Sequence, residues 1–285
     1  MRIVVLAGGT GGAMLARGLL GIADDLTVVA NTGDDIEIHG AHVSPDPDLV
    51  LFWLADRIDE RGWGLAGDTF VAMDRLRARG EDVWFNLGDE DLEIGRDRLR
   101  RLQAGERLTE TLEALRATLG VPARVLPMCD DPVRTFVDGV PFQEWMIRAG
   151  GKAGEAPVRQ IELRGIEAAT VPPEVADAVA GADAVVIGPS NPVVSIGPIL
   201  AVPGMRALLA DVPVVAVSPF VHGEVIKGPT VPCLLAAGVT PDLAGTLALY
   251  GDVVDGVVED VWLGDPAARA RVAGEILGFV KGLRS

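Results

Sequence analysis

The feature that most constrains this chain is a glycine-rich break between two apolar stretches at its start. Residues Ile3–Ala7 are apolar, residues 8–12 read Gly-Gly-Thr-Gly-Gly, and residues 13–20 resume a mainly apolar pattern. This succession predicts a buried strand, a tight turn and a helix. Glycines let backbone N–H groups close on a phosphate, and the N-terminus of the following helix supplies partial positive charge. We therefore expect a phosphate site at this turn.

Two acidic pairs follow the next apolar run, Leu26–Ala30: first Asp34 and Asp35, then Asp46 and Asp48. Carboxylates beside a phosphate loop would repel the phosphate unless a divalent cation lies between them. Because Mg²⁺ usually binds one or two carboxylates together with phosphate oxygens and water, we expect a magnesium site. Asp34 and Asp46 are the preferred ligands, with Asp35 and Asp48 as the alternatives. Solvated turn residues are the competing interpretation, since aspartate favours turns and caps.

The composition fits an α/β protein with a buried parallel sheet. The chain has 285 residues, 49% of them hydrophobic, and a mean hydropathy of +0.31, so it can bury a full core. The net charge of -16 argues against general nucleic-acid binding, which needs a basic surface. No apolar run approaches the ~18 residues that span a bilayer. No signal peptide or disulfide framework is indicated, so we expect a cytoplasmic protein without a membrane partner.

Further apolar runs alternate with helical patterns, which predicts a parallel sheet flanked by helices. Those at Arg124–Pro127, Ala184–Ile187 and Val214–Val217 read as strands. Ligands of such sheets bind beyond the carboxyl ends of the strands. We therefore expect the turns after the strands to converge on one crevice. These turns begin at Gly8, Asn31, Asp130, Gly188 and Ser218.

Between the strands, leucines recur among charged residues from Asp91 to Leu119, as is typical of amphipathic helices. We expect a single α/β domain over residues 1–285, with 89–150 as a mainly helical insertion or cap. Ala149–Pro157 is the best linker candidate. Residues 70–78 predict a helix capped by Asp68 or Thr69, and residues 84–89 read as the end of a strand.

Polar residues in the later turns are candidate nucleotide ligands. Ser190 and Asn191 could present hydroxyl and amide groups to a base, ribose or phosphate. Lys227 is a candidate phosphate contact, with a solvated lysine as the equal alternative. The three histidines have no metal-ligand spacing, and none is expected to bind metal or act as a base. The aromatic residues that could stack on a flat substrate, with core packing as their commoner use, are Trp63, Phe85, Phe142 and Trp145.

Other readings of the glycine turn fit less well. No Lys-Ser/Thr pair follows it, so it is not a Walker A loop. A dehydrogenase would place a lone acidic residue after the second strand to hold the ribose, whereas residues 31–35 read Asn-Thr-Gly-Asp-Asp. An NAD-linked oxidoreductase is therefore a poor match, while a purely structural turn is the alternative for the glycines taken alone.

The motifs occur together in an order that is typical of one family. They are Gly8-Gly9-Thr10-Gly11-Gly12, Asn31-Thr32-Gly33-Asp34-Asp35, Ser44-Pro45-Asp46-Pro47-Asp48, Gly62-Trp63-Gly64, Asp68-Thr69, Leu87-Gly88-Asp89, the segments 127–132, 142–144 and 188–199, and Ser218-Pro219. They cover most of residues 1–229, and the chain resembles the 2-phospho-L-lactate transferase family. The region after Thr230 is less diagnostic.

The resemblance implies a doubly wound, Rossmann-like parallel sheet and a step of coenzyme F420 biosynthesis. Members of the family join a phospholactyl, phosphoenolpyruvyl or phosphoglyceryl group to the terminal hydroxyl of the deazaflavin Fo. The donor is a guanosine diphosphate-type ester and GMP leaves. Mg²⁺ and a homodimer are implied as well. A sister branch of the fold consists of non-catalytic regulators that bind nucleotide sugars, which is the alternative function.

The resemblance also implies roles for residues of this chain. Asp34 and Asp46 would hold Mg²⁺, and Asp48 or Asp35 would orient the acceptor hydroxyl or take its proton. The residues expected to contact the donor nucleotide and its phosphates are Gly9, Thr10, Gly11, Gly12, Asn31, Ser190, Asn191, Ser218 and Lys227. Those expected on the deazaflavin side are Asp48, Trp63, Thr69 and Asn86.

Overall fold

The computed structural model of the chain describes residues 1–148, 156–259 and 261–283. Most of the predicted linker at Ala149–Pro157 lies outside these residues. Within the described ranges, no helix is both long and apolar enough to cross a membrane.

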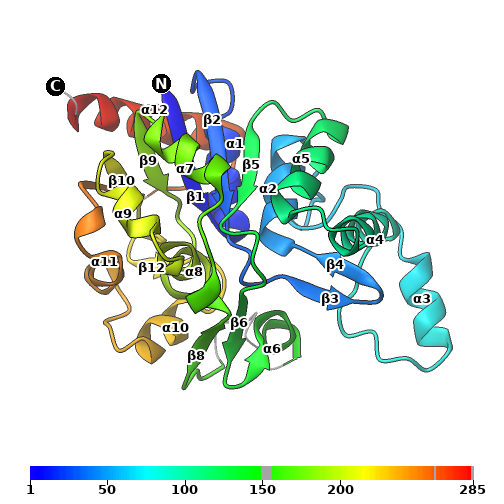
Figure 1. Ribbon diagram of the computed structural model, residues 1–285. Helices are drawn as coiled ribbons and strands as arrows, with labels where there is room; N and C mark the ends of the chain where they lie inside the picture. The colour runs from blue at the N-terminus through cyan, green and yellow to red at the C-terminus, as the bar shows by residue number, and fades with distance from the viewer. Residues whose placement is uncertain (149–155, 260, 284–285) are drawn as a thin grey trace.

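A six-stranded parallel sheet forms the centre of the molecule (Figure 1). In spatial order its strands are β5 (Arg124–Pro127), β2 (Asp25–Ala30), β1 (Arg2–Ala7), β9 (Ala184–Ile187), β10 (Val214–Val217) and β13 (Gly256–Val258). Numbered along the chain this order is 3-2-1-4-5-6, the doubly wound order of Rossmann folds. The predicted fold class is thereby confirmed, and the order reverses between β1 and β9.

The central strand shows why its sequence is apolar at every position. Ile3 and Val5 of β1 pack into one hydrophobic core, while Val4 and Leu6 pack into another on the opposite face. Successive side chains of a strand point to opposite faces, so a strand covered on both sides needs a continuous apolar run.

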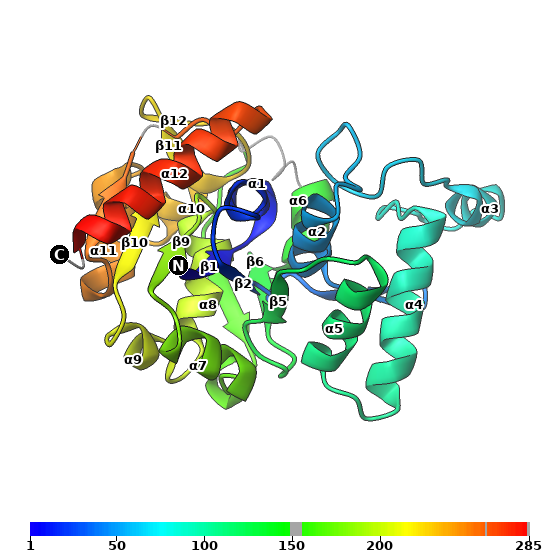
Figure 2. The ribbon, with the colours of Figure 1, turned by 90° about the horizontal axis from the view of Figure 1, so that it is seen from above.

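Helices cover both faces of the sheet, and Figure 2 shows α1 and α12 on one side with α7, α8 and α9 on the other. The helices that contribute to the first core are α1 (Gly9–Leu19), α2 (Pro45–Leu54), α5 (Leu108–Thr118) and α12 (Pro266–Leu283). Those that contribute to the second are α7 (Pro173–Ala180), α8 (Gly197–Ala201), α9 (Met205–Leu209) and α11 (Leu243–Tyr250). Short helical turns are η2 (Ile166–Ala168), η3 (Pro192–Ile196) and η4 (Gly251–Val253).

The remaining elements lie outside the main sheet. Between β2 and β5 these include the hairpin of β3 (Ile36–Ile38) and β4 (Ala41–Val43), and helices α3 (Val71–Ala78) and α4 (Asp89–Gln103). After β5 come β6 (Arg134–Val137), β7 (Val140–Pro141), α6 (Phe142–Arg148) and β8 (Ile161–Arg164). A hairpin of β11 (Phe220–Val221) and β12 (Glu224–Val225) precedes α10 (Thr230–Ala236). The range 89–150 thus contains not only helices but also β5 of the main sheet.

Each of the helices α3 and α4 is capped by an aspartate that lies beside the start of the other helix. Asp89 accepts the backbone N–H groups of Val71 and Ala72 at 2.9 and 2.8 Å, at the start of α3. Asp68 accepts those of Glu90 at 2.9 Å and Asp91 at 3.1 Å, at the start of α4. The expectation that Asp68 or Thr69 caps the first of these helices is therefore wrong, as is a strand over residues 84–89.

Candidate active site

Three of the expected turns meet where the strand order reverses. The backbone N–H of Gly8, after β1, donates to Ser190 Oγ, after β9, at 3.1 Å. Asn31, directly after β2, donates from Nδ2 to the carbonyl of Val194 at 3.4 Å. The turn after β5 does not join them through Asp130, whose carboxylate accepts the Thr109 N–H at 2.8 Å instead. The centre of the site is thus the switch point between β1 and β9, where doubly wound folds bind ligands.

The glycine turn is packed too closely for side chains at three of its positions, Gly8, Gly11 and Gly12. A Cβ on Gly11 would lie 2.4 Å from the carbonyl oxygen of Pro189, and one on Gly12 would lie 2.9 Å from Ser190 Oγ. One on Gly8 would lie 2.5 Å from Ser195 Cβ. These glycines therefore bring the turns after β1 and β9 together. Gly9 differs, because its φ of +67° favours glycine while its Cβ direction is open. Helix α1 begins at this residue.

Asp46 joins the start of α1 to the end of β2. Its Oδ1 accepts the backbone N–H of Gly9 at 2.6 Å, and its Oδ2 accepts Asn31 Nδ2 at 2.9 Å. The Asn31 side chain is held in turn, since its Oδ1 accepts the Gly33 N–H at 2.9 Å. Burial raises the pKa of Asp46 to about 6, although the bonds from Asn31 and Gly9 oppose the shift.

Asp34 is a buried carboxylate beside Asp46. Its Oδ1 has no hydrogen-bond partner among the residues that the structure describes. Burial raises its pKa well above the usual range, and the charge of Asp46 adds to the shift. A bound cation would relieve both effects, so the pair fits a divalent metal. The described ranges contain no group of three or more His, Cys, Asp and Glu side chains placed to hold a metal. Mg²⁺, however, is usually bound by only one or two carboxylates, with water and phosphate oxygens as its other ligands.

The two alternative aspartates are already held by other protein groups. Asp35 accepts the Ser44 hydroxyl at 2.7 Å, and its Oδ2 lies 3.0 Å from His42 Nε2. Asp48 pairs with both terminal nitrogens of Arg98. The four aspartates therefore have different surroundings. Asp34 and Asp46 are buried beside each other, so their negative charges repel. Asp35 is hydrogen bonded to Ser44, and Asp48 is paired with Arg98.

A cleft of about 540 Å³ extends from Asp46 along the insertion that follows β2. Its aromatic lining is Phe52, Trp63, Phe70, Trp84 and Phe85. Its polar lining includes Thr10, Asp46, Asp48, Arg61, Asp68, Asn86, Asp91, Gln143 and Lys227. Aromatic rings and polar side chains line the same cleft, which suits a flat ring system that also carries hydrogen-bonding groups.

Three of the four residues expected on the deazaflavin side line this cleft: Asp48, Trp63 and Asn86. Thr69 is not among the lining residues, and its hydroxyl donates to Asp89. The Trp63 ring is 38% exposed, and the Arg61 guanidinium lies 4.4 Å from its centroid. The ring is therefore held by a cation on one side and open to solvent, as a stacking surface requires.

Of the four aromatic candidates, the other three divide between cleft and core. Phe85 lines the cleft, whereas Phe142 and Trp145 are buried in the small core around α6. Phe142 and Trp145 of α6 therefore pack in a core and are not among the residues that line the cleft.

Several residues expected at the donor serve the turns themselves. Asn191 Oδ1 accepts the N–H groups of Val193 and Val194 at 2.9 and 3.2 Å and so caps η3. The Ser218 hydroxyl is bonded to the backbone of Phe220. With Ser190 bonded to Gly8, these side chains order the loops at the carboxyl ends of the strands. Thr10 and Lys227 line the cleft directly.

Sequence reasoning missed several residues of the site, among them Arg61 and Asp91 in the cleft lining and the buried Arg98 behind Asp48. Arg98 is 3% exposed, which is unusual for an arginine and is not signalled by composition. The available signal was its spacing from Asp91 and Gly95, which places all three on one face of a helix.

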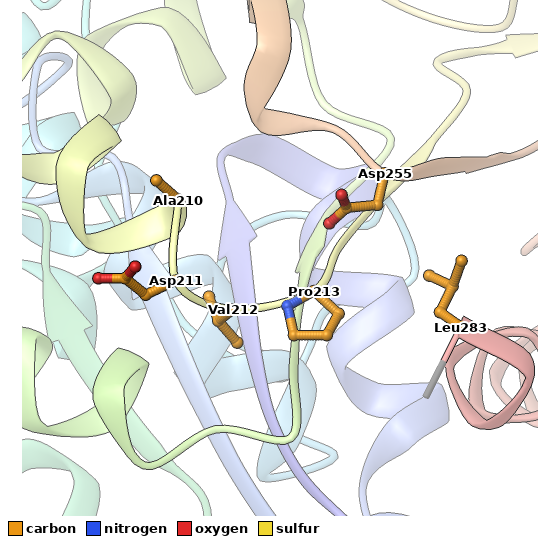
Figure 3. Close-up of a pocket in the computed structure, with 6 residues that line it drawn as sticks. All are labelled: Ala210, Asp211, Val212, Pro213, Asp255 and Leu283. Atoms are coloured by element: carbon orange, nitrogen blue, oxygen red, sulfur yellow. The ribbon is translucent and has the colours of Figure 1, made fainter. Parts of the chain in front are cut away.

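A second hollow lies at the N-terminal end of β10, away from the switch-point loops at the carboxyl ends of the strands, and is drawn in Figure 3. It measures about 330 Å³, and its lining includes Asp211 and Asp255. The Asp255 carboxylate accepts the Val214 N–H at 2.8 Å. The described residues that line this hollow include no cationic side chain, so it does not suit a phosphate.

The fold and the site define a doubly wound α/β protein with two buried neighbouring aspartates, Asp34 and Asp46, at its switch point. A family model described as 2-phospho-L-lactate transferase CofD matches residues 3–258. The chain belongs to this family, as the sequence motifs predict.

Relatives of known name support the assignment over most of the chain. A 2-phospho-L-lactate transferase of Methanosarcina mazei is 38% identical, covering 90% of this chain and 86% of the relative. A phosphoenolpyruvate transferase of Streptomyces coelicolor is 42% identical, with 96% and 90% covered. Among solved structures, a member of the UPF0052 family from Bacillus halodurans has a TM-score of 0.60 at 17% identity, covering 96% of this chain and 99% of that one. That likeness concerns the fold.

Proposed function

We propose that this protein is a transferase of coenzyme F420 biosynthesis. It moves a phospholactyl, phosphoenolpyruvyl or phosphoglyceryl group from a guanosine diphosphate-type donor to the terminal hydroxyl of the deazaflavin Fo, and GMP is released. The observation that carries the proposal is the position of Asp46. Its carboxylate joins the N-terminus of α1 to Asn31 and also lines a cleft with aromatic walls.

The donor would lie across the start of α1. Backbone N–H groups at a helix N-terminus attract phosphate oxygens, and Thr10 of α1 and Lys227 both line the cleft. Asp34 and Asp46 would hold Mg²⁺, which when bound would offset the charge of the diphosphate. The loops ordered by Ser190 and Asn191 would enclose the guanosine side.

The acceptor would lie in the cleft, with its ring system against Trp63 and its chain directed toward Asp46. Asp48 lines the cleft and would orient the terminal hydroxyl and accept its proton. Asp35, the alternative for this role, is not among the residues that line the cleft and is bonded to Ser44.

The reaction forms one bond and breaks another at the same phosphorus atom. The acceptor oxygen bonds to the phosphorus that carries the three-carbon acid, the bond to the oxygen of GMP breaks, and the hydroxyl proton passes to Asp48. Phosphoryl transfer of this kind depends on positioning and charge stabilisation more than on a covalent protein intermediate.

The test is to incubate the full chain with Mg²⁺, Fo and each of the three guanylylated donors, and to measure GMP and phosphorylated deazaflavin by chromatography. Turnover with one donor that stops on chelation supports the proposal and identifies the three-carbon acid. Tight nucleotide binding without GMP release would instead favour a non-catalytic regulator on the same scaffold. Light scattering of the same sample tests the expected homodimer.

A further inference from the structure

We propose that Arg98 is a positioning residue that acts on the acceptor hydroxyl through Asp48. The inference rests on the proposed function, in which Asp48 faces the acceptor. Arg98 itself is not among the residues that line the cleft, so its effect on the reaction must pass through the carboxylate that it holds.

The contact between the two side chains is two-pronged. Arg98 Nη1 donates to Asp48 Oδ2 at 2.9 Å, and Nη2 donates to Oδ1. Nη1 also donates to the backbone carbonyl of His42 at 3.1 Å, which ties the guanidinium to β4. A planar fork that bonds both carboxylate oxygens fixes the orientation of the carboxylate as well as its position.

The helix that carries Arg98 is built to approach this point. Gly95 lies one turn earlier on α4, and a Cβ there would be 2.9 Å from Ala41 Cβ and 3.1 Å from the His42 carbonyl oxygen. The missing side chain therefore lets α4 lie directly against β4, within reach of Asp48. Asp91, on the same face, lines the cleft. One face of α4 thus supplies both a wall residue and the support of the proposed proton acceptor.

A role in stability alone does not account for this arrangement. A largely buried ion pair contributes little net stability, because desolvation of both charges offsets their attraction. What the fork does supply is a single orientation for a carboxylate at the edge of the cleft. A side chain placed even about 1 Å from its productive position can cost roughly 100-fold in rate.

The test compares Arg98→Lys, Arg98→Met, Asp48→Asn and the double variant Asp48→Asn/Arg98→Lys with the unaltered protein. Arg98→Lys keeps the charge but loses the fork. Arg101→Lys is the matched control, since Arg101 lies on the same helix and pairs with Glu106 instead. Thermal unfolding reports the folded fraction of each variant, and steady-state kinetics give kcat and KM for donor and acceptor separately.

We expect Arg98→Lys to lower kcat per folded molecule by roughly 10- to 100-fold while KM for the donor stays within about two-fold. Arg98→Met should be slower still, and the double variant should be no slower than Asp48→Asn alone. Arg101→Lys should retain full activity.

Two results would overturn the inference. One is an Arg98→Lys protein whose kcat per folded molecule is unchanged; the other is a double variant whose loss is the product of the two single losses. An unaltered protein that releases no GMP would overturn the proposed function, and this inference with it. If the unaltered protein releases GMP, the kinetics of the Arg98 variants test the role of Arg98 alone and leave the proposed function standing.

Discussion

The backbone N–H of Gly9 donates to Asp46 Oδ1 at 2.6 Å, so a carboxylate closes the N-terminus of the helix that follows the first strand. This is the place where doubly wound proteins bind phosphate. Asp46 therefore stands between the helix dipole, the Asn31 amide and the neighbouring Asp34. A cation that binds Asp46 would therefore lie close to the phosphate position at the start of α1.

Mg²⁺ should stabilise the protein more at pH 7.5 than at pH 5. The pKa of Asp46 is about 6, so protons compete with the cation at the lower pH. At a Mg²⁺ concentration of about 100 times Kd, the free energy of unfolding should rise by about 2.7 kcal/mol at pH 7.5. Thermal unfolding with and without Mg²⁺ at both pH values measures the difference.

Asp46→Asn is the control for this prediction, and it should remove most of the Mg²⁺ effect. Without Mg²⁺, the same carboxyl should change the free energy of unfolding with pH in the opposite direction. A carboxyl whose pKa is raised by folding binds its proton more tightly in the native state, so this group stabilises the fold as the pH falls through about 6. Equal Mg²⁺ shifts in both proteins would contradict the assignment.

Gly11→Ala should destabilise the fold by about 1–3 kcal/mol, because the new methyl group would press on the Pro189 carbonyl at 2.4 Å. Gly274→Ala is the matched control. It lies within α12, and a Cβ there meets no atom of the described residues within 4 Å. That change should stabilise the helix by about 0.4–1 kcal/mol. Urea unfolding of both variants decides the matter, and similar losses would show that close packing is not what requires Gly11.

The fold was predictable where the sequence signal is local. The short apolar run Ile3–Ala7, rich in β-branched residues and ended by glycines, favours a strand covered on both faces. The same logic located Asn31, since a strand and its following turn are adjacent in sequence. The doubly wound strand order came from the family resemblance, because periodicity does not say which strands are neighbours.

The site was predictable only in part, for a related reason. The sequence predicts Asp34 and Asp46 as one site because each lies at a strand or helix end that faces the expected crevice. The fork from Arg98 to Asp48 spans 50 residues, and the cap from Asp89 to Val71 spans 18. Neither contact has a local signature, so both depend on how the insertion packs after it has formed.

Asp91→Asn should make stability less dependent on pH. Burial, together with the charges of Asp48 and Asp68, raises the pKa of Asp91 to about 7. The native state therefore loses stability from this group as the pH rises through 7. The advantage of Asp91→Asn over the unaltered protein should grow by on the order of 2 kcal/mol between pH 5 and pH 8.

Chemical unfolding at the two pH values measures this change, with Glu93→Gln as the control because Glu93 is exposed on the same helix. The control should follow the unaltered protein at both pH values. An advantage for Asp91→Asn that is the same at pH 5 and pH 8 would show that the carboxyl titrates as an ordinary surface group.

Trp63→Ala should weaken acceptor binding while leaving donor binding intact. The Trp63 ring lines the cleft and is held by Arg61 at 4.4 Å, so its removal takes away a stacking surface that can contribute about 1–3 kcal/mol. This corresponds to roughly a 5- to 150-fold increase in the Kd for Fo. Trp262→Ala removes another exposed tryptophan, one that does not line the cleft, and should leave this Kd unchanged. Titration of Fo by its own fluorescence gives both constants, and calorimetric titration with GDP checks the donor side. If both tryptophan variants bound Fo as the unaltered protein does, the aromatic wall would not be the acceptor surface.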